Sequence, residues 1–178
     1  MRNRAVAGHV GGCGTDRLCA RKGDRAMLFA ISETVAAPRD FVFARAVEFD
    51  RLARAIEGRG ATVAPAAGTG GTPRYEVEYP FRQAMWPVAL ELKDRRAPDA
   101  LQVGVEAALV TALADVAFHE APAAATRVDL SVTLSPRNLQ GRLFLGSLHV
   151  VRGRVEERLR EDLAALARGA EALWRTGV

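Results

Sequence analysis

The spacing of apolar residues predicts one long helix at the end of the chain. Between Ser135 and Trp174 the apolar residues recur every three or four positions, which is the period of one helix face. Ser135 and Pro136 are residue types typical of an N-cap and a first helical turn. A continuous helix of this length requires an extended surface that covers its apolar side.

Alternation of apolar and polar residues predicts a sheet that provides this surface. Five consecutive segments between residues 73 and 134 alternate in this way, and Met27–Val35 and Ala61–Ala67 bring the predicted strands to seven. Pro65 predicts that the strand containing it lies at an edge of the sheet. The residues expected to face the helix include Val88, Val105, Ala112, Ala114, Val116, Phe118, Leu130 and Val132.

Two short helices are predicted between the first two strands. Pro38 is suited to a first helical turn, and apolar residues continue the helical spacing after it. A second helical piece begins near Phe49 and ends near Gly58. The predicted fold is therefore α+β, with a strand, two short helices, six strands and a long C-terminal helix in that order.

This order resembles the START-like superfamily, also called SRPBCC or polyketide cyclase/dehydrase and lipid transport. The residues that carry the resemblance are Ile31-x-x-x-Val35-x-x-Pro38-x-x-x-Val42-Phe43, Phe49-Asp50, Leu143, Phe144, Leu148, Val151 and Val155. The resemblance covers about residues 27–175 and is strongest to the uncharacterised bacterial branch. It implies a helix-grip fold, in which a curved seven-stranded antiparallel sheet wraps around the long helix and leaves a cavity. Members of the superfamily bind apolar molecules there, and some cyclise or dehydrate them.

Charge is concentrated in the first 26 residues, which hold six basic and two acidic side chains and lack periodicity. We expect residues 1–26 to be a disordered basic tail, with translation starting at Met27 as the alternative, and residues 27–176 to form one domain. The net charge of +4 comes from the tail, so no nucleic-acid partner is expected. Because the chain has no long apolar run, we expect no transmembrane segment and a cytoplasmic location.

Candidate chemistry in the chain is sparse. His9, Cys13 and Cys19 lack a fourth ligand and a zinc-like spacing, so we expect no metal and no cofactor. The positions predicted to face inward are nearly all apolar, so no catalytic residue is assigned. Asp115 and His119 fall on the outward side of their strand, and only a β-bulge would turn them inward as an acid–base pair.

These patterns favour binding or transport of a hydrophobic small molecule or lipid in a cavity between the sheet and the helix. The expected ligand-binding residues are Tyr75, Tyr79, Trp86, Phe118, Phe144 and Leu148. One alternative is an enzyme of the cyclase or dehydratase kind, and another is a protein-interaction module whose core is filled.

The start of the long helix is apolar on nearly every side, which predicts a pocket mouth or a homodimer contact, with Leu145 as the residue to test.

Overall fold

The computed structural model describes residues 26–58, 60–68, 71–81 and 84–177. The predicted disordered tail, with His9, Cys13 and Cys19, lies outside the described residues apart from Ala26. The elements follow in the order β1 (Met27–Val35), α1 (Arg39–Ala46), α2 (Phe49–Glu57), β2 (Thr62–Ala67), β3 (Pro73–Phe81), β4 (Ala84–Arg96), β5 (Ala100–Ala107), β6 (Val110–Ala121), β7 (Ala125–Pro136), α3 (Leu139–Val150) and α4 (Arg152–Thr176).

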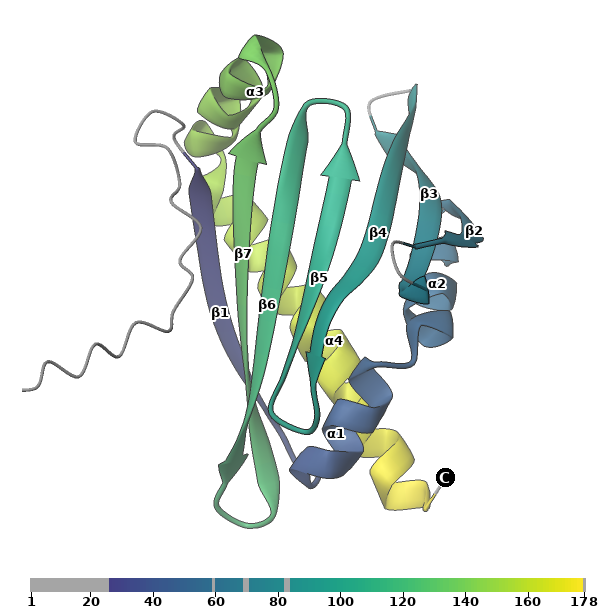
Figure 1. Ribbon diagram of the computed structural model, residues 1–178. Coiled ribbons are helices and arrows are strands. Elements are labelled where there is room, and N and C mark those ends of the chain that lie inside the picture. Colours follow the sequence, from purple (N-terminus) through teal and green to yellow (C-terminus); the bar gives the residue numbers. More distant parts are fainter. Residues whose placement is uncertain (1–25, 59, 69–70, 82–83, 178) are drawn as a thin grey trace, which may run out of the picture.

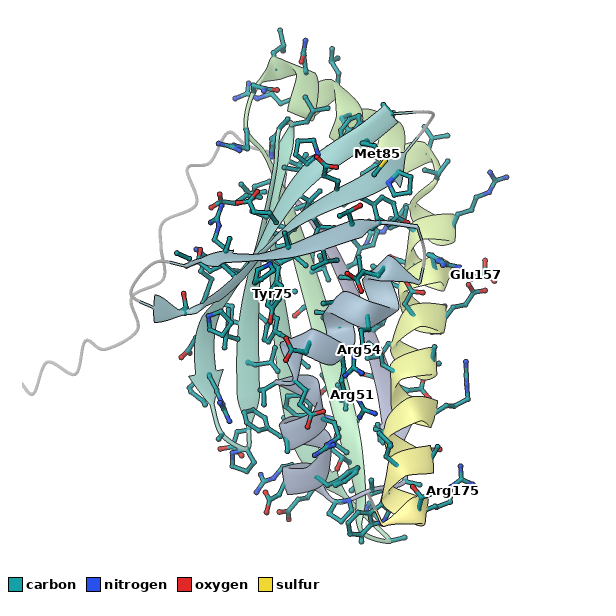
Figure 2. The ribbon with its side chains drawn as sticks, turned by 90° about the vertical axis from the view of Figure 1, so that its right-hand side faces the viewer. Arg51, Arg54, Tyr75, Met85, Glu157 and Arg175 are labelled. Carbon is teal, nitrogen blue, oxygen red and sulfur yellow. The ribbon has the colours of Figure 1, made fainter. Side chains whose placement is uncertain are left out.

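The strands form a single curved antiparallel sheet in the order β1-β7-β6-β5-β4-β3-β2 (Figure 1). Helices α1, α2 and α4 lie on one side of it, and α4 crosses that side diagonally (Figures 1 and 2). This arrangement confirms the predicted helix-grip fold. Strand β2 is an edge strand and contains Pro65, as predicted, because proline has no N–H to donate to a second neighbouring strand.

The C-terminal segment is two helices, so the prediction of one continuous helix from Ser135 to Trp174 is wrong. Strand β7 continues to Pro136, which pairs with Val110 of β6. The helix N-cap is Asn138, whose side chain accepts a hydrogen bond from the Gly141 N–H at 2.8 Å. A break follows at Val151, whose backbone N–H reaches the carbonyl of Leu148 instead of continuing the α-helical pattern.

Local sequence explains this break. Val150 and Val151 are β-branched, and Gly153 follows them, so three residues in four have low helix propensity. The periodicity of apolar positions continues through the break, and a prediction based on spacing alone therefore misses it. Helix α4 still has 25 residues and is about 37 Å long at 1.5 Å per residue.

Helix α3 packs through Gly141 and Leu145, both of which are buried. Leu145, the residue expected to test a pocket mouth or a homodimer contact, is only 5% exposed in the single chain, and a homodimer stays a prediction. An added Cβ at Gly141 would lie 2.1 Å from the backbone oxygen of Leu109, whereas an added Cβ at Gly146 would meet nothing within 4 Å. The absence of a side chain at Gly141 is what lets α3 approach the β5–β6 turn.

Two glycine-to-alanine substitutions in α3 should therefore have opposite effects on stability. Gly141→Ala is expected to destabilise the protein by about 1–3 kcal/mol, because the new methyl group overpacks a fixed backbone contact. Gly146→Ala should stabilise it by about 0.5–1 kcal/mol, because alanine loses less conformational entropy in a helix. Urea unfolding of both variants beside the wild type measures the difference, and equal effects would mean that α3 does not approach Leu109 in solution.

The hydrophobic core lies at the α1 end of the molecule. Its cluster of buried residues comprises Val35, Ala37, Val42, Phe43, Phe49, Leu92, Leu101, Phe118, Val128 and Ala167. These residues come from α1, α2, α4 and the strand ends near them. The space between sheet and helices is therefore filled with side chains at this end.

Candidate functional site

At the α3 end, the helix-facing side of the sheet is only half-buried over its central strands, whereas Met27 and Phe29 of the edge strand β1 are buried. Strand register places one set of apolar side chains on this face, namely Trp86, Val88, Val105, Ala112, Ala114, Val132 and Leu134. All of them are half-buried, and none belongs to the core cluster. Helix α4 makes most of its strand contacts with β1, at the sheet edge. We call this set the open apolar face.

Small residues occupy the middle of the open apolar face. Ala112 and Ala114 of β6 lie between larger neighbours, and Ala114 pairs with Val103 on one side and Val132 on the other. Alanine at these positions adds less side-chain volume above the sheet than valine or leucine would. Apolar surface left accessible in this way is what an apolar ligand buries when it binds.

The structure brings together four of the six predicted ligand-binding residues. Tyr79 is the register partner of Trp86 on the neighbouring strand, and the rings of Trp86 and Phe144 have centroids 6.4 Å apart. Leu148 follows Phe144 by one helical turn, and both are half-buried. Together these residues connect β3, β4 and α3 beside the open apolar face. Tyr79 remains 40% exposed, so its phenol is accessible.

The other two predicted residues lie elsewhere. Phe118 is almost completely buried in the core cluster, where its ring meets Phe43 edge-on at 5.5 Å. Tyr75 stacks in parallel on Phe49 with ring centroids 6.0 Å apart, and its hydroxyl donates a hydrogen bond to Asp50 Oδ1 at 3.0 Å. Burial, together with this hydrogen bond to a carboxylate, raises the pKa of Tyr75. The phenol is therefore neutral at physiological pH.

A hollow of about 290 Å³ opens beside Tyr75, between α2 and the start of β3. It is lined by Val47, Glu48, Phe49, Asp50, Arg51, Arg54, Pro73 and Tyr75. Figure 2 shows Arg51, Arg54 and Tyr75 in the same region around α2. The hollow thus offers guanidinium, carboxylate and phenol groups next to the apolar core, a combination suited to the polar end of a mainly apolar molecule.

One charged residue on the helix-facing side of the sheet, Arg95 of β4, was not predicted from the sequence. The register between β4 and β5 shifts between Leu92 and Asp94, so Arg95 pairs with Leu101, which belongs to the core cluster. The guanidinium carbon of Arg95 lies 5.6 Å from the centre of the Phe43 ring. A single extra residue in a strand reverses the side on which every later residue lies. No alternation pattern reveals such a bulge in advance.

Asp115 and His119 face away from the helices, as predicted for the case without a bulge in their strand. The register of β6 with β7 runs without a shift past both residues, and that of β6 with β5 runs without a shift past Asp115. Asp115 accepts a hydrogen bond from Gln102 at 2.6 Å, and His119 Nε2 lies 3.2 Å from Asp129 Oδ2. These contacts hold the two side chains in separate cross-strand pairs on the outer face of the sheet. They do not form an acid–base pair above the open apolar face.

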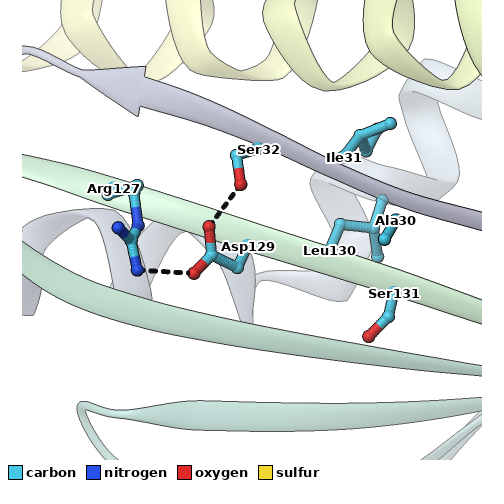
Figure 3. A pocket seen from close by; sticks show the side chains of 7 residues that line it. All are labelled: Ala30, Ile31, Ser32, Arg127, Asp129, Leu130 and Ser131. Carbon is cyan, nitrogen blue, oxygen red and sulfur yellow. Dashed lines mark hydrogen bonds and ion pairs between the residues drawn. The ribbon is translucent and has the colours of Figure 1, made fainter.

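The outer face carries a polar network centred on Asp129 of β7 (Figure 3). Ser32 Oγ donates a hydrogen bond to one carboxylate oxygen of Asp129, while Arg127 Nη2 lies 3.0 Å from the other. An open hollow of about 420 Å³ lies over this network, lined by Ala30, Ile31, Ser32, Arg127, Asp129, Leu130 and Ser131. The serine hydroxyl meets a carboxylate and not an imidazole, so the network lacks the serine–base contact of a nucleophilic centre.

This network makes a pH-dependent contribution to stability. The hydrogen bond from Ser32 lowers the pKa of Asp129, and Arg127 acts in the same direction, against a smaller rise caused by burial. A carboxylate with a lowered pKa stabilises the fold above its unfolded-state pKa of about 4, and this contribution is lost as the pH falls through the folded-state value.

Asp129→Asn should therefore cost about 0.5–1.5 kcal/mol of unfolding free energy at neutral pH, the usual net value of one hydrogen bond. The difference from the wild type should shrink as the pH falls below about 4, because the carboxyl is protonated first in the unfolded wild type and, at lower pH, in the folded protein as well. Urea unfolding at a series of pH values measures this. Glu78→Gln on the exposed side of β3 is the control, and a difference from wild type that is independent of pH for Asp129→Asn would contradict the prediction.

No helix in the described part of the chain is long and apolar enough to cross a membrane. Among the described residues, no three His, Cys, Asp or Glu side chains are grouped so that they would hold a metal ion.

Comparison with known proteins identifies similar structures. No protein-family model and no curated protein sequence matches the chain. TTHA0849 from Thermus thermophilus has a TM-score of 0.64 at 16% identity, covering 82% of this chain and 98% of that one. The Zhui aromatase/cyclase from Streptomyces sp. R1128 has a TM-score of 0.63 at 16% identity, with 83% and 95% covered. Ara h 8.0201 has a TM-score of 0.59 at 11% identity, with 85% and 99% covered.

At these identities the likeness concerns the fold. The shared features are the curved antiparallel sheet and the long C-terminal helix, and they extend over nearly the whole length of each similar chain. They agree with the element order, the sheet topology and the helix placement described above. The chain therefore has the helix-grip fold, which these similar structures share.

Proposed function

We propose that the protein binds an apolar small molecule or lipid on the open apolar face. The observation that carries this proposal is the division of the helix-facing side into a filled end and an open end. At the α1 end the side chains form a closed core, whereas at the α3 end the apolar side chains of the central strands stay half-buried. Burying such surface against a ligand contributes about 25 cal/mol per Å².

Aromatic residues at the α3 end support the proposal. Trp86 and Phe144 approach each other from β4 and α3 and give a ligand two large apolar surfaces to contact. Tyr79 adds an accessible phenol beside them, which is suited to hydrogen bonding with one polar group of the ligand. A mainly apolar ligand with a single polar end fits this distribution.

Similar structures include proteins whose names state an aromatase/cyclase activity, one from Streptomyces sp. R1128 and one from the steffimycin biosynthetic pathway. We infer from them only that this fold accommodates apolar substrates. A cyclase or dehydratase activity of this chain would have to use groups other than Asp115 and His119, because both lie on the outer face of the sheet. The phenol of Tyr79 is an accessible titratable group beside the open apolar face. A cytoplasmic location stays a prediction.

Native mass spectrometry of the gently purified full chain tests the proposal, followed by organic extraction of anything bound. We expect a discrete added mass that is released as an apolar compound. Protein without bound ligand is then titrated with a fluorescent fatty acid and with a fluorescent quinone. A protein that carries no added mass and takes up neither probe would contradict ligand binding and favour a protein-interaction module.

A further inference from the structure

Helix α3 presents a stripe of exposed apolar side chains on the side opposite its packing contacts. Leu139 is 70% exposed, Leu143 is 71% exposed and Val150 is 87% exposed. At 100° per residue these three positions fall within about 40° of one another around the helix. Gly141 and Leu145, which pack against the sheet, point to the other side. The stripe is thus one continuous surface, and we call it the α3 stripe.

The exposed apolar surface continues onto the neighbouring strand. Leu28 of β1 is half exposed, and its backbone oxygen accepts a hydrogen bond of 2.7 Å from Arg152, the first residue of α4. The start of β1 therefore lies next to the junction between α3 and α4. Several large apolar side chains exposed at one end of a molecule are unusual unless that surface meets a partner.

The chain segment that contains the stripe carries charge of a single sign. Between Asp129 and Glu156 the sequence contains four arginines and no acidic residue. Helix geometry places Arg142 and His149 along one margin of the α3 stripe, and Arg154 follows in the first turn of α4. Glu156 is the first acidic residue after this segment, and it pairs with Arg152 at 2.9 Å. An apolar stripe with basic margins is complementary to a surface that is apolar within and anionic outside.

We propose that the α3 stripe docks the protein onto an anionic lipid bilayer. A helix with this distribution lies in the plane of the interface, with its apolar side in the boundary between headgroups and acyl chains and its basic residues near anionic headgroups. A second copy of the chain fits less well, because a symmetric contact through the same face would bring the arginines of both copies together. The proposal does not depend on the ligand of the open apolar face.

Vesicle sedimentation of the full chain tests the proposal. We expect the wild type to bind vesicles of phosphatidylcholine mixed with an equal part of phosphatidylglycerol, and to bind pure phosphatidylcholine vesicles far less. Binding should weaken as salt is added, because salt screens the attraction between arginines and headgroups. The double variant Leu139→Ser, Leu143→Ser should bind at least about tenfold more weakly, because it loses most of its apolar insertion.

Controls isolate the contribution of α3. Leu166→Ser removes an exposed apolar side chain from α4, away from the stripe, and should bind like the wild type. Arg154→Gln should weaken binding several-fold and reduce its salt dependence. The basic residues 1–26 are present in every variant, so any contribution they make is common to the series. Circular dichroism and urea unfolding check that the variants are folded, which we expect because the replaced side chains are exposed.

Two outcomes would overturn the proposal. One is that the wild type does not bind the anionic vesicles, or that the double variant binds them as well as the wild type does. The other is a stable dimer by light scattering that the Leu139→Ser, Leu143→Ser change dissociates, without vesicle binding by the wild type. That second outcome would assign the stripe to a homodimer contact.

Discussion

Ala114→Trp is expected to weaken the binding of an apolar probe by at least about tenfold, a change of about 1.4 kcal/mol in binding free energy. Ala114 lies in the middle of the open apolar face, between Val103 and Val132 of the neighbouring strands. An indole group at this position would occupy the space that the proposed ligand takes. Because Ala114 is only half-buried, the larger side chain has room to lie on the sheet, and the fold should remain intact.

Fluorescence titration with the fatty acid or quinone that the wild type binds measures this change. The matched control is Ala30→Trp, which adds the same side chain to the exposed outer side of β1. The control should bind the probe like the wild type, and urea unfolding should show that both variants are folded. Equal affinity of Ala114→Trp and wild type would place the ligand somewhere other than the open apolar face.

Phe118→Ala is expected to lower the free energy of unfolding by about 3–5 kcal/mol, the usual cost of removing a buried phenylalanine side chain. Only 3% of Phe118 is exposed, and its ring packs edge-on against Phe43 of α1. Removing the ring would leave a cavity between β6 and α1, which the fixed backbone of the sheet cannot close. Such a loss is a large fraction of the stability of a domain of this size.

The same variant also tests the division between the filled end and the open end. If Phe118 serves only the core, the folded fraction of Phe118→Ala should bind the apolar probe with wild-type affinity. Leu113→Ala on the outer side of the same strand is the control and should cost far less stability, because Leu113 is partly exposed. A loss of affinity with little loss of stability would instead give Phe118 the ligand-binding role predicted from the sequence.

Helix α3 connects the two proposals. Phe144 and Leu148 on one part of its surface lie beside the open apolar face, while Leu139 and Leu143 on another part are exposed. This explains why the segment is apolar on nearly every side in the sequence. Periodicity alone cannot assign such a helix a buried side, since several of its sides carry leucine or valine. The packing of Gly141 against Leu109 decides which side turns inward.

The order of secondary-structure elements can be predicted from the amino-acid pattern alone. The order of one strand, two short helices, six strands and a C-terminal helical segment follows from the two periods of the apolar pattern. Alternation also placed Ala114, Val105 and Val132 on the helix-facing side and Asp115 and His119 on the outer side. These assignments hold because a strand has a strict period of two, which a hydrophobic pattern records residue by residue.

Tertiary packing, by contrast, determines where the chain departs from these periods and which surfaces stay open. The break at Val151 and the bulge after Leu92 are single-residue events, and they leave the surrounding spacing of apolar residues unchanged. Burial also separates Phe118 in the core from Trp86 on the open apolar face, although both are large aromatic residues on the same side of the sheet. The side of the sheet on which a residue lies follows from the local alternation of the strand. Its burial depends instead on which helix packs over it, and α4 packs mainly over β1.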